Sequence, residues 1–78
     1  LALVVVDGDA EPFIRQGRNV FHGFVTACDP WLRPNETCLI VNVKGDLLGH
    51  GVSQCTPEEI ATFQKGVAIK TRDGIKTE

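Results

Sequence analysis

The segment Ala-Glu-Pro-Phe-Ile-Arg-Gln-Gly-Arg-Asn-Val-Phe, residues 10–21 of 78, contains residues typical of the start and the end of a short helix. Pro12 is tolerated in the first turn of a helix, and the Asp-Gly-Asp triplet at 7–9 offers good N-cap side chains just before it. Gly17 stands where the C-cap of a helix takes a left-handed residue. The segment therefore predicts a short helix over residues 10–16, followed by a glycine-containing loop and a strand.

Short apolar stretches on either side of this segment predict β-strands. Residues 1–6, Leu-Ala-Leu-Val-Val-Val, form a continuous apolar run that suits a strand buried on both faces. Lys44-Gly45-Asp46 is typical of a tight hairpin turn between two further strands. The predicted strands cover residues 1–6, 20–27, 37–43, 47–54 and 67–70, with a closing turn at 72–74.

A capping box predicts a second helix. Thr56 is the N-cap, Pro57 occupies the first helical position, Glu59 completes the box, and Gly66 ends the helix. The order β-α-β-β-β-α-β, with helices too short to cover a parallel sheet, predicts a mainly β fold. We expect a small mixed-sheet pseudo-barrel flanked by two short helices. The expected core is Val20, Phe24, Val25, Leu39, Val41, Leu47, Leu48, Val52, Ile60, Phe63, Val67 and Ile69.

Length and composition limit the class of protein. The 78 residues allow one domain, and no apolar run approaches the roughly 20 residues needed to cross a bilayer. The sequence does not begin with Met and shows no signal peptide, so we interpret it as a segment of a longer protein or a processed chain. The net charge of −2 argues against nucleic-acid binding by bulk positive charge, but it permits a local basic face.

The sequence shows no pattern typical of catalysis or metal binding. The candidate ligands Cys28, Cys38, Cys55, His22 and His50 lack the Cys-x-x-Cys or His-x-x-x-His spacing of structural zinc sites. We interpret the cysteines as small apolar residues in strands, and the histidines as strand residues with partly exposed rings. Three cysteines at these spacings are no disulfide framework and favour a reducing, cytoplasmic setting. We therefore expect no catalytic residue, metal or cofactor, and a small metal-binding protein, which would need bound zinc by elemental analysis, is a third interpretation.

Six of the eight basic residues fall into two segments, one around Gly17 and one in the last 14 residues. If the fold brings the loop at Gly17 beside the last strand, a basic groove forms on an otherwise acidic chain. The alternative is a set of scattered, solvated charges. The residues concerned are Arg15, Arg18, Lys65, Lys70, Arg72 and Lys76.

Five segments, in order, resemble the PUA domain, an RNA-binding module attached to pseudouridine synthases and archaeal transglycosylases. They are Val4–Asp7 with residues 10–17, residues 17–21, Asp29-Pro-Trp-Leu-Arg-Pro34, Gly45-Asp-Leu-Leu48 with Gly51, and Glu58-Glu59 with residues 65–72. Asn35 departs from the pattern where a glycine often follows Arg-Pro, but asparagine also tolerates the left-handed conformation. The resemblance implies one PUA-like RNA-binding domain over residues 1–74 and a C-terminal tail at 75–78. The residues of these motifs are most similar to those of the C-terminal PUA domain of archaeal tRNA-guanine (archaeosine) transglycosylases.

The resemblance also implies where RNA would lie, namely in a groove between the first helix, the glycine loop and the last strand. The arginines and lysines would contact phosphates, the glycine would let the RNA backbone approach, and the asparagine would donate to a phosphate or sugar. Phe21 is expected in the core rather than as a platform for bases. The implied RNA-binding residues are Arg15, Gly17, Arg18, Asn19, Lys65, Lys70, Arg72 and Lys76.

The function implied is that of a non-catalytic module. It would anchor tRNA by its acceptor stem or 3′ end for an RNA-modification enzyme in the same polypeptide, in the cytoplasm and without a membrane partner. The alternative is a regulatory or protein-interaction accessory domain of the same fold that does not bind RNA.

Overall fold

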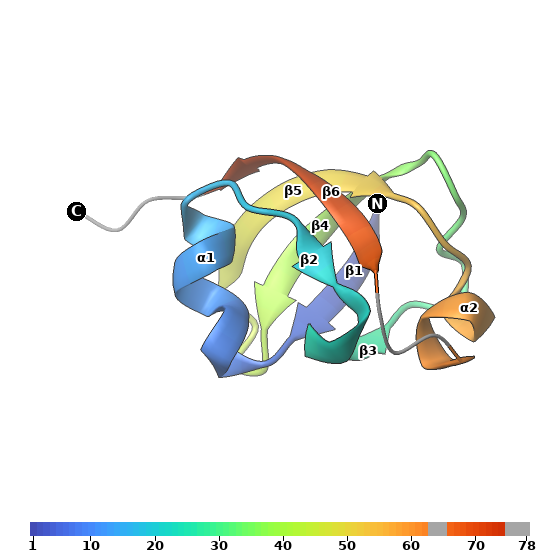
Figure 1. The fold of residues 1–78 in the computed structure, drawn as a ribbon, viewed down its shortest axis with the longest axis horizontal. Coiled ribbons are helices and arrows are strands. Elements are labelled where there is room, and N and C mark those ends of the chain that lie inside the picture. Colours follow the sequence, from blue (N-terminus) through green and yellow to red (C-terminus); the bar gives the residue numbers. More distant parts are fainter. Residues whose placement is uncertain (63–65, 75–78) are drawn as a thin grey trace.

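The computed structural model describes residues 1–62 and 66–74, which form one curled sheet with a short helix at each end (Figure 1). The strands are β1 (Ala2–Val6), β2 (Val20–Phe21), β3 (Val25–Cys28), β4 (Thr37–Asn42), β5 (Leu47–Ser53) and β6 (Val67–Gly74). The α-helices are α1 (Glu11–Arg15) and α2 (Pro57–Thr62), and two 3-10 turns are η1 (Gly8–Ala10) and η2 (His22–Phe24). No helix in these described ranges is long and apolar enough to span a membrane.

The sheet has six strands in the order β2-β6-β5-β4-β1-β3. β1 and β4 run parallel, and the other neighbouring strands are antiparallel. Such a mixed, curled sheet is a half-barrel, so the predicted mainly β fold with two flanking helices is confirmed.

Local side-chain contacts start and stop the first helix much as the sequence predicts. The carboxylate of Asp7 accepts the N–H of Asp9 at 3.0 Å, and the chain then makes η1 before α1 begins. Gly17 has a φ of +86°, and its N–H donates to the carbonyl of Ile14 at 2.9 Å. Because L-residues with a side chain rarely adopt this φ, Gly17 is the residue that lets the chain leave the helix.

The capping box of the second helix is confirmed in both directions. The hydroxyl of Thr56 accepts the N–H of Glu59 at 3.2 Å, and the carboxylate of Glu59 accepts the N–H of Thr56 at 3.0 Å. Two otherwise unsatisfied N–H groups are thereby bonded.

The single strand predicted over residues 20–27 is wrong, because the chain changes sheet partner within it. β2 pairs with β6 at one edge of the sheet, whereas β3 pairs with β1 at the other edge. The turn η2 makes the crossing, and the N–H of His22 donates to the carbonyl of Gly66 at 3.0 Å.

The last strand is longer than predicted, and the turn expected at 72–74 is wrong. β6 continues to Gly74 because Asp73 and Gly74 pair with His50 and Gly49 of β5. The segment that carries Lys70 and Arg72 is therefore paired with β5, with a shift of register at Arg72, since His50 pairs with Asp73 and Gly51 with Thr71.

The core lies inside the curl of the sheet and corrects several expectations. Alternation in β1 buries Ala2, Val4 and Val6 but leaves Leu3 39 % exposed, so residues 1–6 are not buried on both faces. The inward positions of β4 are Cys38 and Ile40, which turns Leu39 toward the outside. Of the expected core, Val20, Val41, Leu48, Ile60 and Ile69 are buried, Phe24, Val25, Leu39, Val52 and Val67 are half-buried, Leu47 is exposed, and Phe63 lies outside the described residues.

The cysteines and histidines follow the expectation only in part. Cys28 and Cys38 lie in strands, and Cys55 lies in the turn before α2; all three are free thiols. His22 was expected to be partly exposed but is buried, because η2 turns it inward against Cys55, with 3.6 Å between Nε2 and Sγ. Within residues 1–62 and 66–74, no three potential metal ligands lie together.

Candidate nucleic-acid interface

The structure brings the loop after α1 and the last strand side by side. The side-chain oxygen of Asn19 accepts the N–H of Thr71 at 3.2 Å, and Val20 pairs with Ile69 one step further along. The end of β6 also passes close to the last turn of α1, since a Cβ added to Gly74 would lie only 2.5 Å from the carbonyl oxygen of Arg15. The two basic segments of the sequence thus adjoin.

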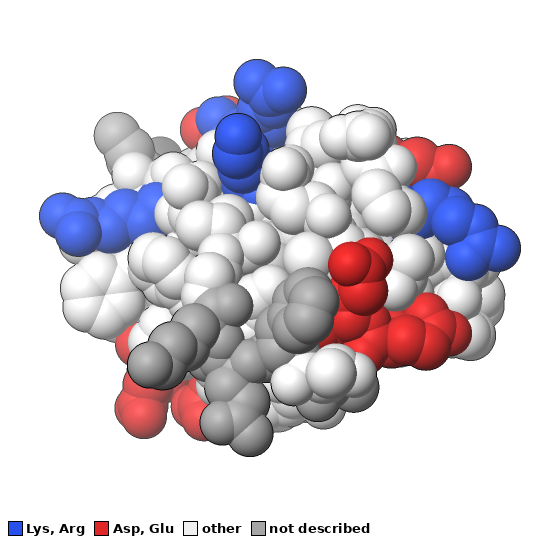
Figure 2. Space-filling view, turned by 45° about the vertical axis from the view of Figure 1, so that its right-hand side comes forward, with Lys and Arg blue, Asp and Glu red and all other residues white. Residues whose placement is uncertain are grey.

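Three exposed basic side chains belong to this junction, and we call them the basic strip: Arg18, Lys70 and Arg72. Asn19 follows Arg18 in the loop, and its side chain bonds to Thr71 of β6. Thr71 in turn lies between Lys70 and Arg72 in the sequence. Figure 2 shows positive side chains at the left, top and right margins of one face, and larger groups of Asp and Glu in its lower half. The chain as a whole is acidic, so positive potential is local to such places.

Arg15 lies close by, but its guanidinium is engaged within the fold. Its Nε and terminal nitrogen donate to one carboxylate oxygen of Glu11 at 3.1 and 3.0 Å, and its side chain is 19 % exposed. This pairing at i and i+4 is available because α1 places the two residues on one side of the helix. A phosphate contact by Arg15 would have to compete with Glu11.

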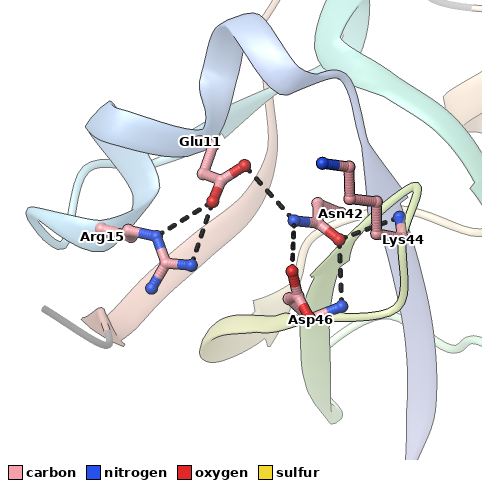
Figure 3. Close-up of polar contacts among 5 residues, drawn as sticks. All are labelled: Glu11, Arg15, Asn42, Lys44 and Asp46. Atoms are coloured by element: carbon pink, nitrogen blue, oxygen red, sulfur yellow. Dashed lines mark hydrogen bonds and ion pairs between the residues drawn. The ribbon is translucent and has the colours of Figure 1, made fainter. Parts of the chain in front are cut away.

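The hydrogen bonds between Glu11 and Arg15 belong to a network that extends into the hairpin between β4 and β5 (Figure 3). The amide nitrogen of Asn42 donates to Glu11 and to Asp46, at 3.3 Å in each case. The amide oxygen of Asn42 accepts the N–H groups of Lys44 and Asp46, both at 2.9 Å. One buried asparagine therefore closes the hairpin and ties it to α1, which fixes the helix that carries one side of the junction.

The remaining residues named from the sequence divide into two groups. Gly17 lies in the loop, and a Cβ added there would meet nothing within 4 Å, so its requirement for glycine comes from its φ of +86°. Lys65 and Lys76 lie outside the described residues. The described part of the site is therefore the basic strip with Asn19 and Gly17.

An aromatic groove beside Arg18 is the feature that the sequence did not reveal. Its volume is about 240 Å³, and Phe13 and Phe21 on its wall are each 49 % exposed. Phe21 was expected in the core; this is wrong, because Val20 points inward and the next residue of a strand points outward. The alternation of side chains along a strand, with Val20 turned inward, could have indicated from the sequence that Phe21 faces outward. The groove is lined by Ala10, Phe13, Ile14, Arg18, Asn19, Phe21 and Phe24.

The groove combines stacking surface with hydrogen-bond donors. The guanidinium carbon of Arg18 lies 5.9 Å from the ring centroid of Phe13, within cation–π range. The amide oxygen of Asn19 accepts the N–H of Thr71. The NH₂ group of the same side chain can therefore donate to a ligand. Half-exposed rings, an arginine and an amide donor suit a planar ring system with hydrogen-bond acceptors on its edge.

The thiols do not add a nucleophile to this surface. Burial raises the pKa of Cys38 to about 11. Burial, followed by the negative charge of Glu59, raises the pKa of Cys55. Burial and the nearby Asp29 and Glu58 raise the pKa of Cys28. A raised pKa keeps a thiol protonated and unreactive.

Comparison with known proteins places the chain in a family. Residues 3–75 match the model of the PUA domain family. The tRNA-guanine(15) transglycosylase of Thermococcus kodakarensis is 47 % identical over 73 residues, which are 94 % of this chain and 13 % of that protein. The chain thus spans about an eighth of the length of the curated relatives it matches.

Solved structures share the fold. A PUA domain protein from Thermoplasma acidophilum has a TM-score of 0.89 and 24 % identity, over 97 % of this chain and 50 % of that one. A chain of an H/ACA ribonucleoprotein bound to a substrate RNA has a TM-score of 0.94 and 17 % identity, over 99 % of this chain and 24 % of that one. At these identities the likeness shows the fold alone.

Proposed function

This chain belongs to the PUA domain family, whose members are in general non-catalytic RNA-binding modules, and from that premise we propose that it anchors tRNA. The tRNA would be held by its acceptor stem and 3′ end for an RNA-modification enzyme in the same polypeptide. The relatives named as tRNA-guanine(15) transglycosylases support a parent of that kind, acting in the cytoplasm of an archaeon on the path to archaeosine.

The observation that carries the proposal is the position of the basic strip beside the aromatic groove. Arg18, Lys70 and Arg72 are each exposed on two segments that Asn19 and Thr71 join, and they suit the phosphates of a stem, which proteins recognise by shape and backbone. The half-exposed Phe13 and Phe21 suit an unpaired base, which a single-stranded 3′ end offers and a duplex does not. A stem that ends in unpaired nucleotides presents both features at once.

The test is a salt titration of tRNA binding by fluorescence anisotropy. Three phosphate contacts give a slope of log K against log salt of about −2 to −3. Each lost contact makes this slope less steep by about 0.7 to 0.9. We expect Arg18→Ala and Lys70→Ala each to weaken binding at 50 mM salt (about the lower limit of such titrations) and to flatten the slope. The matched controls are Arg33→Ala and Lys44→Ala, two exposed basic residues outside the strip, which should change neither.

Two results would contradict the proposal. One is that both strip variants bind tRNA as the parent chain does at low salt. The other is that removal of the unpaired 3′ nucleotides leaves the affinity unchanged while Phe21→Ala also has no effect. Loss of all tRNA retention at moderate salt by the unmodified chain would favour the alternative of an accessory domain that binds protein.

A further inference from the structure

The outer side of the sheet is apolar where solvent would normally meet polar side chains. We call its residues Leu3, Val5, Ala27 and Leu39 the outer apolar face. They are neighbours across three strands, because Leu3 pairs with Leu39 and Val5 pairs with Ala27. A sheet with one solvated side usually alternates apolar and polar residues, whereas strands covered on both sides carry apolar residues throughout. This half of the sheet therefore has the composition of a covered surface.

The outer apolar face is separate from the basic strip. Along the same outer side, the sheet becomes charged at β6, where Lys70 pairs with Val52 and Asp73 pairs with His50. β5 lies between β6 and the strands of the apolar face in the sheet order. The apolar face itself holds no basic residue, which makes a polyphosphate chain an unsuitable occupant.

An exposed tryptophan lies in the turn that borders this face. Asp29 holds that turn to β1: its N–H donates to the carbonyl of Leu3 at 3.0 Å, and its carboxylate accepts the N–H of Leu3 at 2.8 Å. Trp31, two residues on, is 59 % exposed, and Leu1, which precedes β1, is 79 % exposed. Tryptophan is enriched at the buried centres of protein interfaces, so its exposure here points to a protein partner.

We propose that the outer apolar face, with Trp31, docks against the remainder of a longer polypeptide that contains this domain; this rests on the proposed function, in which a catalytic domain is attached. In the compared transglycosylase the matched region is 13 % of the protein, and in the Thermoplasma acidophilum structure it is 50 % of the chain. The arrangement leaves the basic strip free for tRNA.

The test compares thiol labelling in the 78-residue chain and in the full-length parent polypeptide. Leu3→Cys and Trp31→Cys place a thiol on the face and in its bordering turn, and mass spectrometry of each peptide separates them from the native cysteines. We expect both thiols to react with maleimide in the short chain and at least tenfold more slowly in the parent. The control is Val43→Cys, an apolar position 69 % exposed in the hairpin, which should react equally in both.

Three outcomes would overturn the docking proposal. Equal labelling rates at position 3 in both lengths would show that nothing covers the face. Slower labelling in the short chain at higher protein concentration would show that a second copy covers it. Protection of position 3 by added tRNA would assign the face to RNA. Failure of the proposed tRNA function appears separately, as loss of tRNA binding by the unmodified parent.

Discussion

Substituting Gly74 by alanine tests the junction on which the candidate interface depends. A Cβ at this position would lie 2.5 Å from the carbonyl oxygen of Arg15 and 2.6 Å from its carbonyl carbon, and it would also meet the carbonyl of Ile14. All of these atoms belong to the backbone of the last turn of α1, so no side chain can rotate away. Either α1 or the end of β6 has to shift.

The size of the effect follows from overpacking against rigid neighbours, which typically costs 1–3 kcal/mol, so we expect a loss of about 2 kcal/mol for Gly74→Ala. For a domain of this length that corresponds to a fall in Tm of about 8–16 °C, measured by circular dichroism. The matched control is Gly8→Ala, because a Cβ at Gly8 would meet nothing within 4 Å. The control should change stability by less than about 0.5 kcal/mol.

The same substitution should also weaken tRNA binding, since a shift of α1 moves Arg18 relative to β6. The reasoning is refuted if Gly74→Ala and Gly8→Ala have the same Tm. In that case α1 and β6 do not pass as closely as described, and the basic strip loses its support.

Two further predictions concern stability. Thr56→Ala removes one half of the capping box and should lower the free energy of unfolding by about 1 kcal/mol, seen as a fall in Tm of about 4–8 °C. The same Tm for Thr56→Ala and the parent chain would mean that the box contributes nothing. Cys38 has a pKa raised by burial from 9.0 to about 11, so the folded chain keeps a proton that the unfolded chain releases above pH 9. The stability of the parent chain should therefore fall between pH 9 and 11 by up to about 2.7 kcal/mol relative to Cys38→Ala in urea unfolding, and parallel pH profiles would contradict this.

The features that the sequence predicted well are those decided within one turn of chain. The capping box at Thr56 and Glu59 and the left-handed residue at Gly17 need no distant partner. Asn35 also has a φ of +65°, as expected for an asparagine that replaces a glycine. The mainly β fold followed from the order of these local elements together with a resemblance that covers nearly the whole chain.

The errors arose where distant partners decide the conformation. The break in residues 20–27 exists because β2 and β3 join opposite edges of the sheet. The residues of this segment alone do not predict that change of partner. In β4 both sides carry aliphatic residues, so alternation alone did not show that Cys38 and Ile40, rather than Leu39, face inward. Phe21 was misplaced for a related reason, since its side depends on the pairing of Val20 with Ile69.

The candidate site was predictable in its charges but not in its shape. The grouping of Arg18, Lys70 and Arg72 could be inferred from two basic segments and the resemblance. The engagement of Glu11 by Arg15 follows a helical spacing, but its continuation to Asn42 does not, because it joins residues 31 positions apart. The aromatic groove needed the relative placement of α1 and β2, which only the folded chain provides.

The way the edge of β6 is covered has a consequence for behaviour in concentrated solution. β2 supplies only two residues along that edge, but the side chain of Asn19 takes the N–H of Thr71, and α1 closes over Gly74. A strand from a neighbouring molecule therefore finds few vacant amides on which to extend the sheet. The fold can present an exposed, grooved surface to a ligand and still resist ordered polymerisation from that edge.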